Sequence, residues 1–309
     1  MNRHNLIIIL GATASGKTKL AVKVADALNG EIISADSRQI FKRMDIGTGK
    51  DLQEYQINGK TIPYHLIDIL APGARYHVDA FKNDFYKAFE SIIEKNKIPI
   101  LCGGTGMYIH SLLQNQTFTA IPVNQQLRDQ FNLLSKEELI SKLQSDKNQN
   151  IDHVDLSSKK RLIRALEIAE YLKHNTLEAI ARPEIKPIIF GLKNEVEITR
   201  AKILARLDQR FKAGLIEEVA QLLKEGISKE ILVFYGLEYK FIVNYLDGLL
   251  TFEELKLRLG IAICQYAKRQ NTFFRKMEKD NVEIIWLDAS ADTNLLQQLI
   301  IEKVSISEN

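Results

Sequence analysis

The stretch GATASGKT at residues 11–18 has the residue types and spacing of a loop that holds phosphate groups. It matches the pattern G-x-x-x-x-G-K-[ST], it directly follows the apolar run 6–10, and a segment of helical period begins after it. In such a loop, backbone N–H groups point at phosphate oxygens, and the positive end of the helix dipole adds to the attraction. Lys17 would add a point charge, and Thr18 would offer a hydroxyl to Mg²⁺. The sequence therefore predicts a phosphate-binding loop.

A second polar stretch follows the next apolar run. Asp36 ends the run EIISAD, and a hydroxyl, a guanidinium and an amide come directly after it, from Ser37, Arg38 and Gln39. These groups are suited to hydrogen bonds with a nucleobase or a phosphate. Ligands of open α/β sheets bind outside the carboxyl ends of the strands, so Asp36 is expected to face the same crevice as Lys17. The alternative is an ordinary turn or N-cap aspartate. A carboxylate opposite a phosphate cradle indicates transfer of a group onto a nucleobase.

The usual acidic partner of a P-loop is missing from its expected place. In P-loop NTPases an aspartate after a second buried strand helps to hold Mg²⁺. Here the run IPILC ends in GGTG at 103–106. Asp68 and Asp288 are possible substitutes, or simply residues at strand ends. These residues alone leave the identity of the bound phosphate open.

Short apolar, β-branched runs alternate with segments of helical period along most of the chain. The runs are 6–10, 31–34, 65–70, 98–103, 187–192 and 282–287. This alternation predicts an α/β fold like that of P-loop NTPases, with a parallel sheet and helices on both faces. The rhythm breaks at 119–186, where a capping box at 135–138 and the run 159–172 indicate helices. We therefore expect a P-loop α/β core made of 1–118 and 187–309, the second part ending in helices, and a small helical insertion domain at 119–186.

The composition is that of an ordinary globular protein. Of 309 residues, 45% are hydrophobic and 26% charged, and the net charge of +3 permits a polyanionic partner without requiring one. The two cysteines, Cys102 and Cys264, argue against a disulfide framework and favour a reducing compartment. The apolar run 6–10 is too short for a signal peptide or a membrane span. We expect a cytoplasmic monomer with no membrane partner.

Two groups of basic residues could meet a nucleic acid. The first lies on one predicted helix and comprises Lys159, Lys160, Arg161 and Arg164, beside the apolar Leu162, Leu166 and Ile168. The second recurs at helical spacing near the C-terminus and comprises Arg258, Gln265, Arg269, Thr272 and Lys276. Either group alone is most simply a solvated charged surface.

Five stretches, taken in order, resemble the motifs of the tRNA dimethylallyltransferases, also called tRNA isopentenylpyrophosphate transferases. They are GATASGKT (11–18), SADSRQIFKRMDIGTGK (34–50), ILCGGTGMYI (100–109), KRLIRALEI (160–168) and YAKRQNTFFRK (266–276). The resemblance implies transfer of a dimethylallyl group from dimethylallyl diphosphate, with Mg²⁺, to N6 of the adenosine just 3′ of the tRNA anticodon, which is tRNA position 37. The loop would then hold the diphosphate of a prenyl donor, and no Walker-B acid would be needed.

The resemblance also implies roles for single residues. Asp36 would accept a proton from the attacking amine. Lys17 and Thr13 would be catalytic contacts of the donor phosphates, and Thr18 would contact the metal. The donor diphosphate would lie on Gly11, Ala12, Thr13, Ala14, Ser15, Gly16, Lys17 and Thr18. The tRNA anticodon stem-loop would contact Asp36, Ser37, Arg38, Gln39, Thr105, Arg128, Lys160, Arg161, Leu162, Ile163, Arg164, Lys268, Arg269, Gln270 and Arg275. The two basic groups lie at matching positions, which favours contact with the phosphate backbone.

Three other functions fit parts of the sequence. A P-loop small-molecule kinase would use the loop but would leave both basic groups unexplained. An RNA-binding module with a vestigial loop conflicts with the intact Gly16, Lys17 and Thr18. An adenylate isopentenyltransferase, which prenylates a free nucleotide, has less need of the helical insertion and the basic C-terminal helix. Two departures from the family pattern are Ala12, where proline is common, and the stretch FYGLEYKF at 234–241, to which no tRNA contact is assigned.

Overall fold

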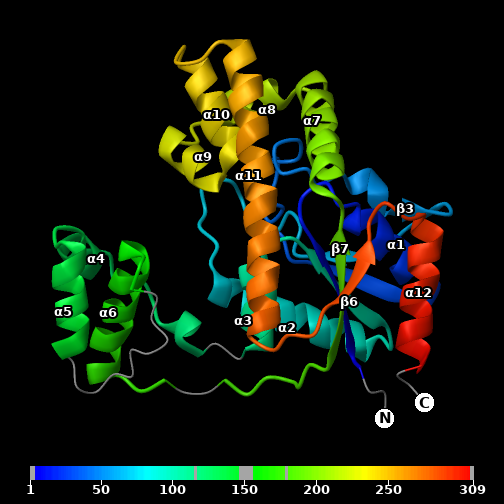
Figure 1. Cartoon of the computed structure of the whole chain (residues 1–309), viewed down its shortest axis with the longest axis horizontal. Helices are drawn as coiled ribbons and strands as arrows, with labels where there is room; N and C mark the ends of the chain where they lie inside the picture. The colour runs from blue at the N-terminus through cyan, green and yellow to red at the C-terminus, as the bar shows by residue number, and fades with distance from the viewer. Residues whose placement is uncertain (1–3, 115–116, 146–155, 178–179, 307–309) are drawn as a thin grey trace. The chain divides into compact units, whose positions relative to one another are not determined.

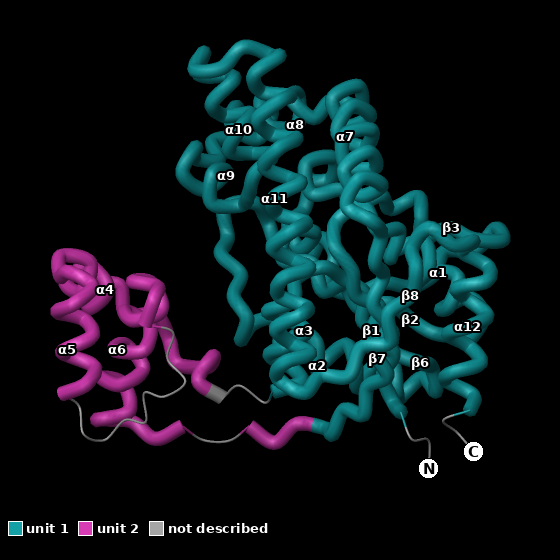
Figure 2. Tube along the Cα trace, in the orientation of Figure 1, with its two compact units in different colours: residues 1–114, 183–309 teal, residues 115–182 magenta. Residues whose placement is uncertain are grey.

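The computed structural model describes residues 4–114, 117–145, 156–177 and 180–306, which belong to two compact units (Figure 1, Figure 2). Unit 1 comprises Met1–Gln114 and Pro183–Asn309, and unit 2 comprises Asn115–Arg182. In the described ranges, no helix is both long enough and apolar enough to cross a membrane.

Unit 1 is built around a six-stranded sheet in which every neighbouring pair of strands is parallel. The strand order is β5 (Tyr64–His65), β2 (Gly30–Ser34), β6 (Ile98–Gly103), β1 (Leu6–Gly11), β7 (Pro187–Lys193) and β8 (Ile285–Asp288). The strand that leads into the P-loop is therefore central, with Ile8 opposite Leu101 on one side and Ile189 on the other. The predicted α/β fold with a parallel sheet is confirmed.

Helices cover both faces of the sheet because successive strand residues point to opposite sides. The covering helices are α1 (Lys17–Leu28), α2 (Val78–Glu94), α3 (Gly106–Leu113), α12 (Thr293–Ile306) and the C-terminal part of α11 (Phe252–Lys279). Ile7 and Ile9 of β1 pack with α1 and α12. Ile8 and Leu10 of the same strand pack with α2, α3 and α11.

A second buried cluster lies among the helices that follow β7, which Figure 1 shows grouped at one end of the sheet. These helices are α7 (Val196–Lys212), α8 (Leu215–Lys224), α9 (Lys229–Tyr235), α10 (Leu237–Leu246) and the N-terminal part of α11. Phe41 and Met44, from the segment after β2, insert into this cluster. Helix α11 belongs to both cores, since Leu259 lies in the helical cluster and Phe274 in the sheet core.

Two strands differ from the expected runs. β5 ends after two residues instead of continuing to residue 70, because Leu66 and Asp68 adopt left-handed backbone conformations with φ of 62° and 56°. β8 begins at Ile285 rather than at 282, although Val282 is already buried in the sheet core. A short hairpin of β3 (Gln56–Ile57) and β4 (Lys60–Thr61) follows the 3-10 helix η1 (Leu52–Tyr55).

Unit 2 consists of helices over its described residues. They are the 3-10 helix η2 (Thr117–Ala120) and the α-helices α4 (Gln125–Asn132), α5 (Lys136–Ser145) and α6 (Lys159–His174). The capping box predicted at 135–138 is confirmed, because Ser135 N–H donates to Glu138 Oε2 at 2.7 Å and Glu138 N–H donates to Ser135 Oγ at 3.1 Å. The buried core of the unit includes Phe131, Leu139, Leu143, Leu162, Ile163 and Leu166.

Candidate active site

The turn between β1 and α1 has the backbone of a phosphate-binding loop. Gly16 has a φ of 82°, in the left-handed region that glycine adopts without strain, and α1 begins at the next residue. Gly11 has no space for a side chain, because a Cβ there would lie 2.7 Å from Ser15 Oγ and 3.1 Å from the carbonyl oxygen of Leu192. The first N–H groups of α1 have no partner within the helix, so the turn offers them to an anion.

Lys17 lies half-buried at the base of this loop. Burial lowers the pKa of its ammonium group, and the neighbouring Cys102 and Asp36 act in the opposite direction. A charge with little water around it interacts strongly with an anion, because the local dielectric is low. The position therefore suits a ligand with several negative charges.

The segment after β2 is held in a defined turn. Asp36 Oδ1 accepts the Arg38 N–H at 3.0 Å, and the Ser37 N–H donates to Thr105 Oγ1 at 3.1 Å. Thr105 belongs to the GGTG stretch after β6, the strand next to β2 in the sheet. The two predicted motifs therefore meet because their strands are neighbours, and the contact fixes the Asp36 backbone.

One pocket joins the P-loop to this turn. Its walls include Thr13, Lys17 and Thr18 from the loop and Asp36, Arg38 and Gln39 from the turn. Its other lining residues are Gly47, Thr48, Gly49, Arg206, Arg210, Leu237, Glu238, Ile263, Tyr266 and Gln270. Asp36 and Lys17 thus line the same pocket, as their places at the ends of parallel strands predict.

Two arginines of α7 belong to the pocket and are absent from the site predicted from sequence. Arg206 and Arg210 are one helical turn apart; Arg206 donates to the carbonyl oxygen of Gly49 at 3.2 Å, and Arg210 Nη1 lies 3.4 Å from Glu238 Oε1. Burial, with the charge of Arg206 beside it, lowers the pKa of Arg210. Their separation by four residues puts both arginines on one face of a helix, which could have indicated a shared site. Solvent-exposed helices show the same spacing, so it does not distinguish the two cases.

The stretch that departs from the family pattern, 234–241, also contributes to the pocket. Glu238 lies between two arginines, with Oε2 3.6 Å from Arg38 Nη1 and Oε1 facing Arg210. Gly236 leaves room for Arg38, because a Cβ there would lie 2.1 Å from Nη1. The Arg38 guanidinium also lies 5.4 Å from the centre of the Tyr266 ring. A guanidinium beside an aromatic ring is a combination that contacts bases and phosphates in nucleic-acid sites.

Gln270 of α11 connects two loops of the pocket. Its Oε1 accepts the Thr13 N–H at 2.9 Å, and its Nε2 donates to the Gly104 carbonyl oxygen at 2.9 Å. The side chain is buried, so its main contacts are internal, and a contact with tRNA stays a prediction. Lys268, Arg269 and Arg275 are exposed on the same helix, and their contact with tRNA is likewise a prediction.

Two predicted RNA-binding residues of unit 2 are instead part of its core. Leu162 and Ile163 are 0% and 5% exposed and pack against α4 and α5. The period of α6 turns both side chains inward, and a contact of these residues with tRNA stays a prediction. Lys160 and Arg161 lie on the exposed side of the same helix.

Two predicted RNA-binding arginines of unit 2 each form an ion pair with the same buried carboxylate. Arg128 donates through Nε and Nη2 to the buried Glu167 carboxylate at 3.0 and 2.9 Å. Arg164 pairs with the same carboxylate and donates to the Ile121 carbonyl oxygen at 2.7 Å. Burial raises the pKa of Glu167, but these hydrogen bonds outweigh it and lower the pKa overall. Both arginines thus stabilise the unit.

Neither acid considered as a Walker-B substitute lines the pocket. Asp68 pairs with Lys50, and Asp288 accepts the Ser290 N–H at 2.9 Å. Among the residues that the structure describes, no group of three or more His, Cys, Asp and Glu side chains is placed to hold a metal ion. Mg²⁺ in phosphate sites needs one or two protein oxygens besides the substrate phosphates, and Thr18 and Asp36 both offer oxygens to this pocket. The residues therefore fit Mg²⁺ bound together with a phosphate ligand.

Comparisons with known proteins identify the family of the chain. A family model described as IPP transferase matches residues 39–277. The chain is 49% identical over 289 residues to a protein of Phocaeicola vulgatus named tRNA dimethylallyltransferase 2, with 94% of each chain covered. It is 46% identical over 293 residues to a protein of Parabacteroides distasonis named tRNA dimethylallyltransferase 1, with 95% of each covered.

Solved structures show the same fold. The full-length tRNA isopentenylpyrophosphate transferase from Bacillus halodurans aligns with a TM-score of 0.71 at 31% identity, covering 98% of both chains. A eukaryotic dimethylallyltransferase described as acting on tRNA shares the fold with a TM-score of 0.74 at 23% identity, covering 98% of this chain and 79% of its own. The fold and the pocket define a P-loop α/β protein whose phosphate loop faces a carboxylate. The chain belongs to the IPP transferase family, as its motifs predict.

Proposed function

We propose that this protein transfers a dimethylallyl group from dimethylallyl diphosphate to N6 of the adenosine immediately 3′ of the anticodon in tRNA. The observation that carries the proposal is the shared pocket of Lys17 and Asp36. The donor needs a cationic loop to stabilise its leaving diphosphate, and the acceptor amine needs a carboxylate to take up its proton. Membership of the IPP transferase family and relatives named tRNA dimethylallyltransferase support the same reaction.

The donor binds with its diphosphate on the P-loop. Thr13 and Lys17 contact the phosphates from one side, and Arg206 contacts them from α7. Negative charge grows on the diphosphate as the C1–O bond of the donor breaks, and fixed charges stabilise it without rearrangement. Leu237 and Ile263, on the pocket wall, give apolar contact to the prenyl chain.

Mg²⁺ accompanies the diphosphate. Thr18 would hold it through its hydroxyl, beside the phosphates of the donor. The ion supplies positive charge to the leaving group. No γ-phosphate is transferred in this reaction, so the reaction does not require an acidic residue at the end of β6.

Asp36 acts as the general base. The exocyclic amine attacks C1, the N6–C1 bond forms as the C1–O bond breaks, and one amine proton passes to the Asp36 carboxylate while diphosphate leaves. The hydrogen bond between Asp36 Oδ1 and the Arg38 N–H fixes the orientation of the carboxylate. In the described part of the chain it is the one hydrogen bond of this side chain, so the pocket faces a carboxylate with acceptor capacity left.

The tRNA binds along basic side chains of both units. On α11 these are Lys268, Arg269 and Arg275, and on α6 they are Lys160 and Arg161. Arginine and lysine contacts with phosphates position the RNA, whereas Gln39 at the pocket and Ser37 in the same turn read the base. The target adenine is stacked in the anticodon loop, so it must be turned out of the stack to reach Asp36. Because Lys160 and Arg161 are exposed on α6, we assign unit 2 to contact with tRNA.

The test is incubation with dimethylallyl diphosphate, Mg²⁺ and unmodified tRNA, followed by mass analysis of the nucleosides. We expect N6-dimethylallyladenosine at one position. Parallel reactions with AMP as acceptor, and with ATP and small acceptors in place of the donor, separate the alternatives. Prenylated AMP without prenylated tRNA would make the protein an adenylate isopentenyltransferase. ATP turnover without prenyl transfer would make it a kinase.

A further inference from the structure

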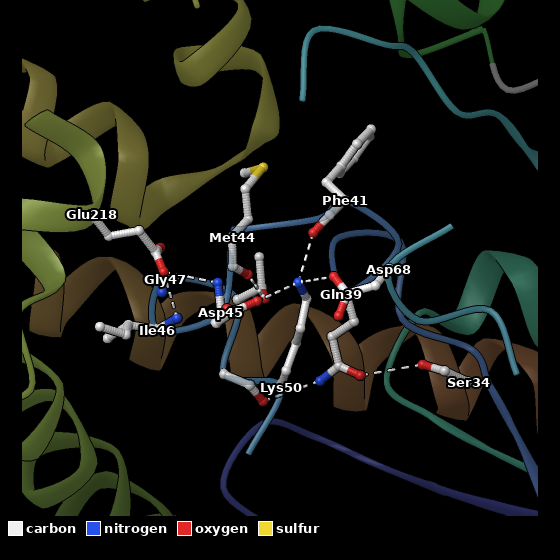
Figure 3. Close-up of polar contacts among 12 residues, drawn as sticks. Ser34, Gln39, Phe41, Met44, Asp45, Ile46, Gly47, Lys50, Asp68 and Glu218 are labelled. Carbon is white, nitrogen blue, oxygen red and sulfur yellow. Dashed lines mark hydrogen bonds and ion pairs between the residues drawn. The ribbon is translucent and has the colours of Figure 1, made fainter. Parts of the chain in front are cut away.

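The loop at 45–50 forms one wall of the pocket, and its backbone is hydrogen-bonded to a carboxylate of α8. Glu218 Oε2 accepts the N–H groups of Asp45 and Ile46 at 2.8 and 2.7 Å, and Oε1 accepts that of Gly47 at 3.0 Å (Figure 3). Successive N–H groups that converge on one anion form a nest, a backbone site for a negative charge. The chain fills its own nest with Glu218, which fixes the first half of the loop.

The Glu218 carboxylate is itself fixed by α10. The Tyr239 hydroxyl donates to Glu218 Oε1 at 2.9 Å, so this oxygen accepts two hydrogen bonds. The Tyr239 ring also lies against the loop, because a Cβ at Gly47 would be 2.6 Å from the ring. The loop therefore approaches α8 and α10 as closely as its backbone allows.

The second half of the loop is anchored by a buried lysine. Lys50 Nζ donates to the Phe41 carbonyl oxygen at 2.6 Å and to Asp45 Oδ1 at 2.6 Å, and it pairs with Asp68 (Figure 3). These contacts join both ends of the loop, since Asp45 begins it and Lys50 ends it. The residues between them have little freedom to move relative to the pocket.

The fixed loop presents one carbonyl oxygen to two pocket side chains. Gly49 O accepts Gln39 Nε2 at 3.1 Å and Arg206 Nη2 at 3.2 Å. Gln39 belongs to the turn that carries Asp36, on the acceptor side, whereas Arg206 belongs to the donor side. Gly49 has a φ of 61°, which strains other residues, and a Cβ there would lie 1.7 Å from Arg210 Nη2 and so displace that arginine. Arg206 also pairs with Asp51, and Gln39 Oε1 accepts from Ser34 Oγ at 3.2 Å, so the carbonyl is the contact that links the two sides to each other.

We propose that Glu218 is a positioning residue that aligns the two substrates through the Gly49 carbonyl. The proposal rests on the proposed function, because it takes Arg206 as a contact of the donor and Gln39 as a contact of the acceptor. Glu218 lies outside the pocket lining, so it would act through the loop rather than on a substrate. Its carboxylate has two acceptor oxygens for four donors, whereas a glutamine has one acceptor oxygen and an NH₂ group that would face N–H donors.

The test compares Glu218→Gln with Glu217→Gln in single-turnover transfer at saturating donor and tRNA. Glu217 is exposed on the same helix, so its variant has the same charge change without the nest. We expect Glu218→Gln to slow transfer by about 10- to 100-fold, the order of loss that small misplacements cause, and to leave the KM for tRNA unchanged. Glu217→Gln should keep the wild-type rate. Tyr239→Phe removes one hydrogen bond from Glu218 and should slow transfer by about 3- to 10-fold. This variant tests the same proposal if Glu218→Gln folds poorly.

A double-mutant cycle separates positioning from general loss of stability. If Glu218 acts through Arg206, the penalty of Glu218→Gln shrinks at least about threefold in an Arg206→Ala background. Equal rates for Glu218→Gln and Glu217→Gln, or the same penalty with and without Arg206, would overturn the proposal. Absence of prenyl transfer by both the wild type and Glu217→Gln would instead overturn the proposed function.

Discussion

Replacing Glu31 by glutamine tests how the strand that leads into Asp36 is held. Glu31 lies in β2, and its 2% exposed carboxylate contacts His65 Nε2 at 2.7 Å, Lys97 Nζ at 2.8 Å and Lys95 Nζ at 3.4 Å. Burial alone would raise the pKa of this carboxyl. Hydrogen bonds from Lys97 and His65, with the charges of both lysines, instead lower it to about 2. The folded protein therefore favours the ionised form.

The size and sign of the effect follow from this pKa. A change from 4.5 to about 2 is about 2.5 pKa units, or about 3 kcal/mol of folding free energy at neutral pH. Because the pKa is lower in the folded than in the unfolded protein, this stabilisation is present above pH 4.5 and is lost as the pH falls toward 2. Glu31→Gln should therefore lower the free energy of unfolding by about 3 kcal/mol at pH 7, and the difference from wild type should shrink in acid.

Urea unfolding at a series of pH values measures this difference. Trp286, the one tryptophan of the chain, lies in β8, so its fluorescence reports unfolding of unit 1. Glu94→Gln, at an exposed position of α2, is the matched control and should cost little at any pH. A Glu31→Gln deficit that stays constant between pH 7 and pH 3 would refute the reasoning, because it would not arise from the ionised carboxylate.

Four further predictions concern the site and unit 2. Asp36→Asn keeps the shape of the side chain but cannot accept a proton, so single-turnover transfer should fall by about 10²–10⁴-fold while donor and tRNA still bind; loss of tRNA binding at an unchanged rate would make it a recognition residue. Lys17→Ala should weaken donor binding and slow transfer severely, and near-normal transfer would contradict the phosphate role of the loop. Lys160→Glu should lower the salt slope of tRNA binding by about 0.9 per lost phosphate contact without changing donor affinity, and an unaltered slope would return this residue to solvated surface. Arg164→Glu should destabilise unit 2 by about 3 kcal/mol or more, seen as earlier loss of helical circular dichroism, because it leaves Glu167 beside a like charge.

The parts of the site that come from one continuous stretch could be predicted from the sequence. The P-loop and the turn at Asp36 are local motifs at the ends of apolar strands, and parallel strands place their carboxyl ends at one edge of the sheet. Arg206 and Glu238 could not be found in this way, because they reach the pocket only through the packing of α7 and α10. Sequence spacing on a helix does not show which face is buried.

The same limit applies to the buried residues of α6 and to the length of β5. Leu162 and Ile163 stand among basic residues in the sequence, and only the contacts of α6 with α4 and α5 show that they are core residues. The apolar run at 65–70 reads as a strand, but Asp68 leaves the sheet to pair with Lys50, eighteen residues earlier in the chain. A partner that distant in sequence is not visible in a local pattern of apolar residues.

The hydrogen bond between Thr13 and Gln270 also has a consequence for protein synthesis. The two residues are 257 positions apart, so a ribosome that adds 5–20 residues per second needs roughly 13–50 s to proceed from one to the other. During that time the growing chain has the whole GATASGKT sequence but lacks the amide that holds Thr13, and for most of it also lacks Arg206. A truncated or nascent chain therefore cannot assemble the donor pocket. The complete pocket can form only after Gln270 has been synthesised.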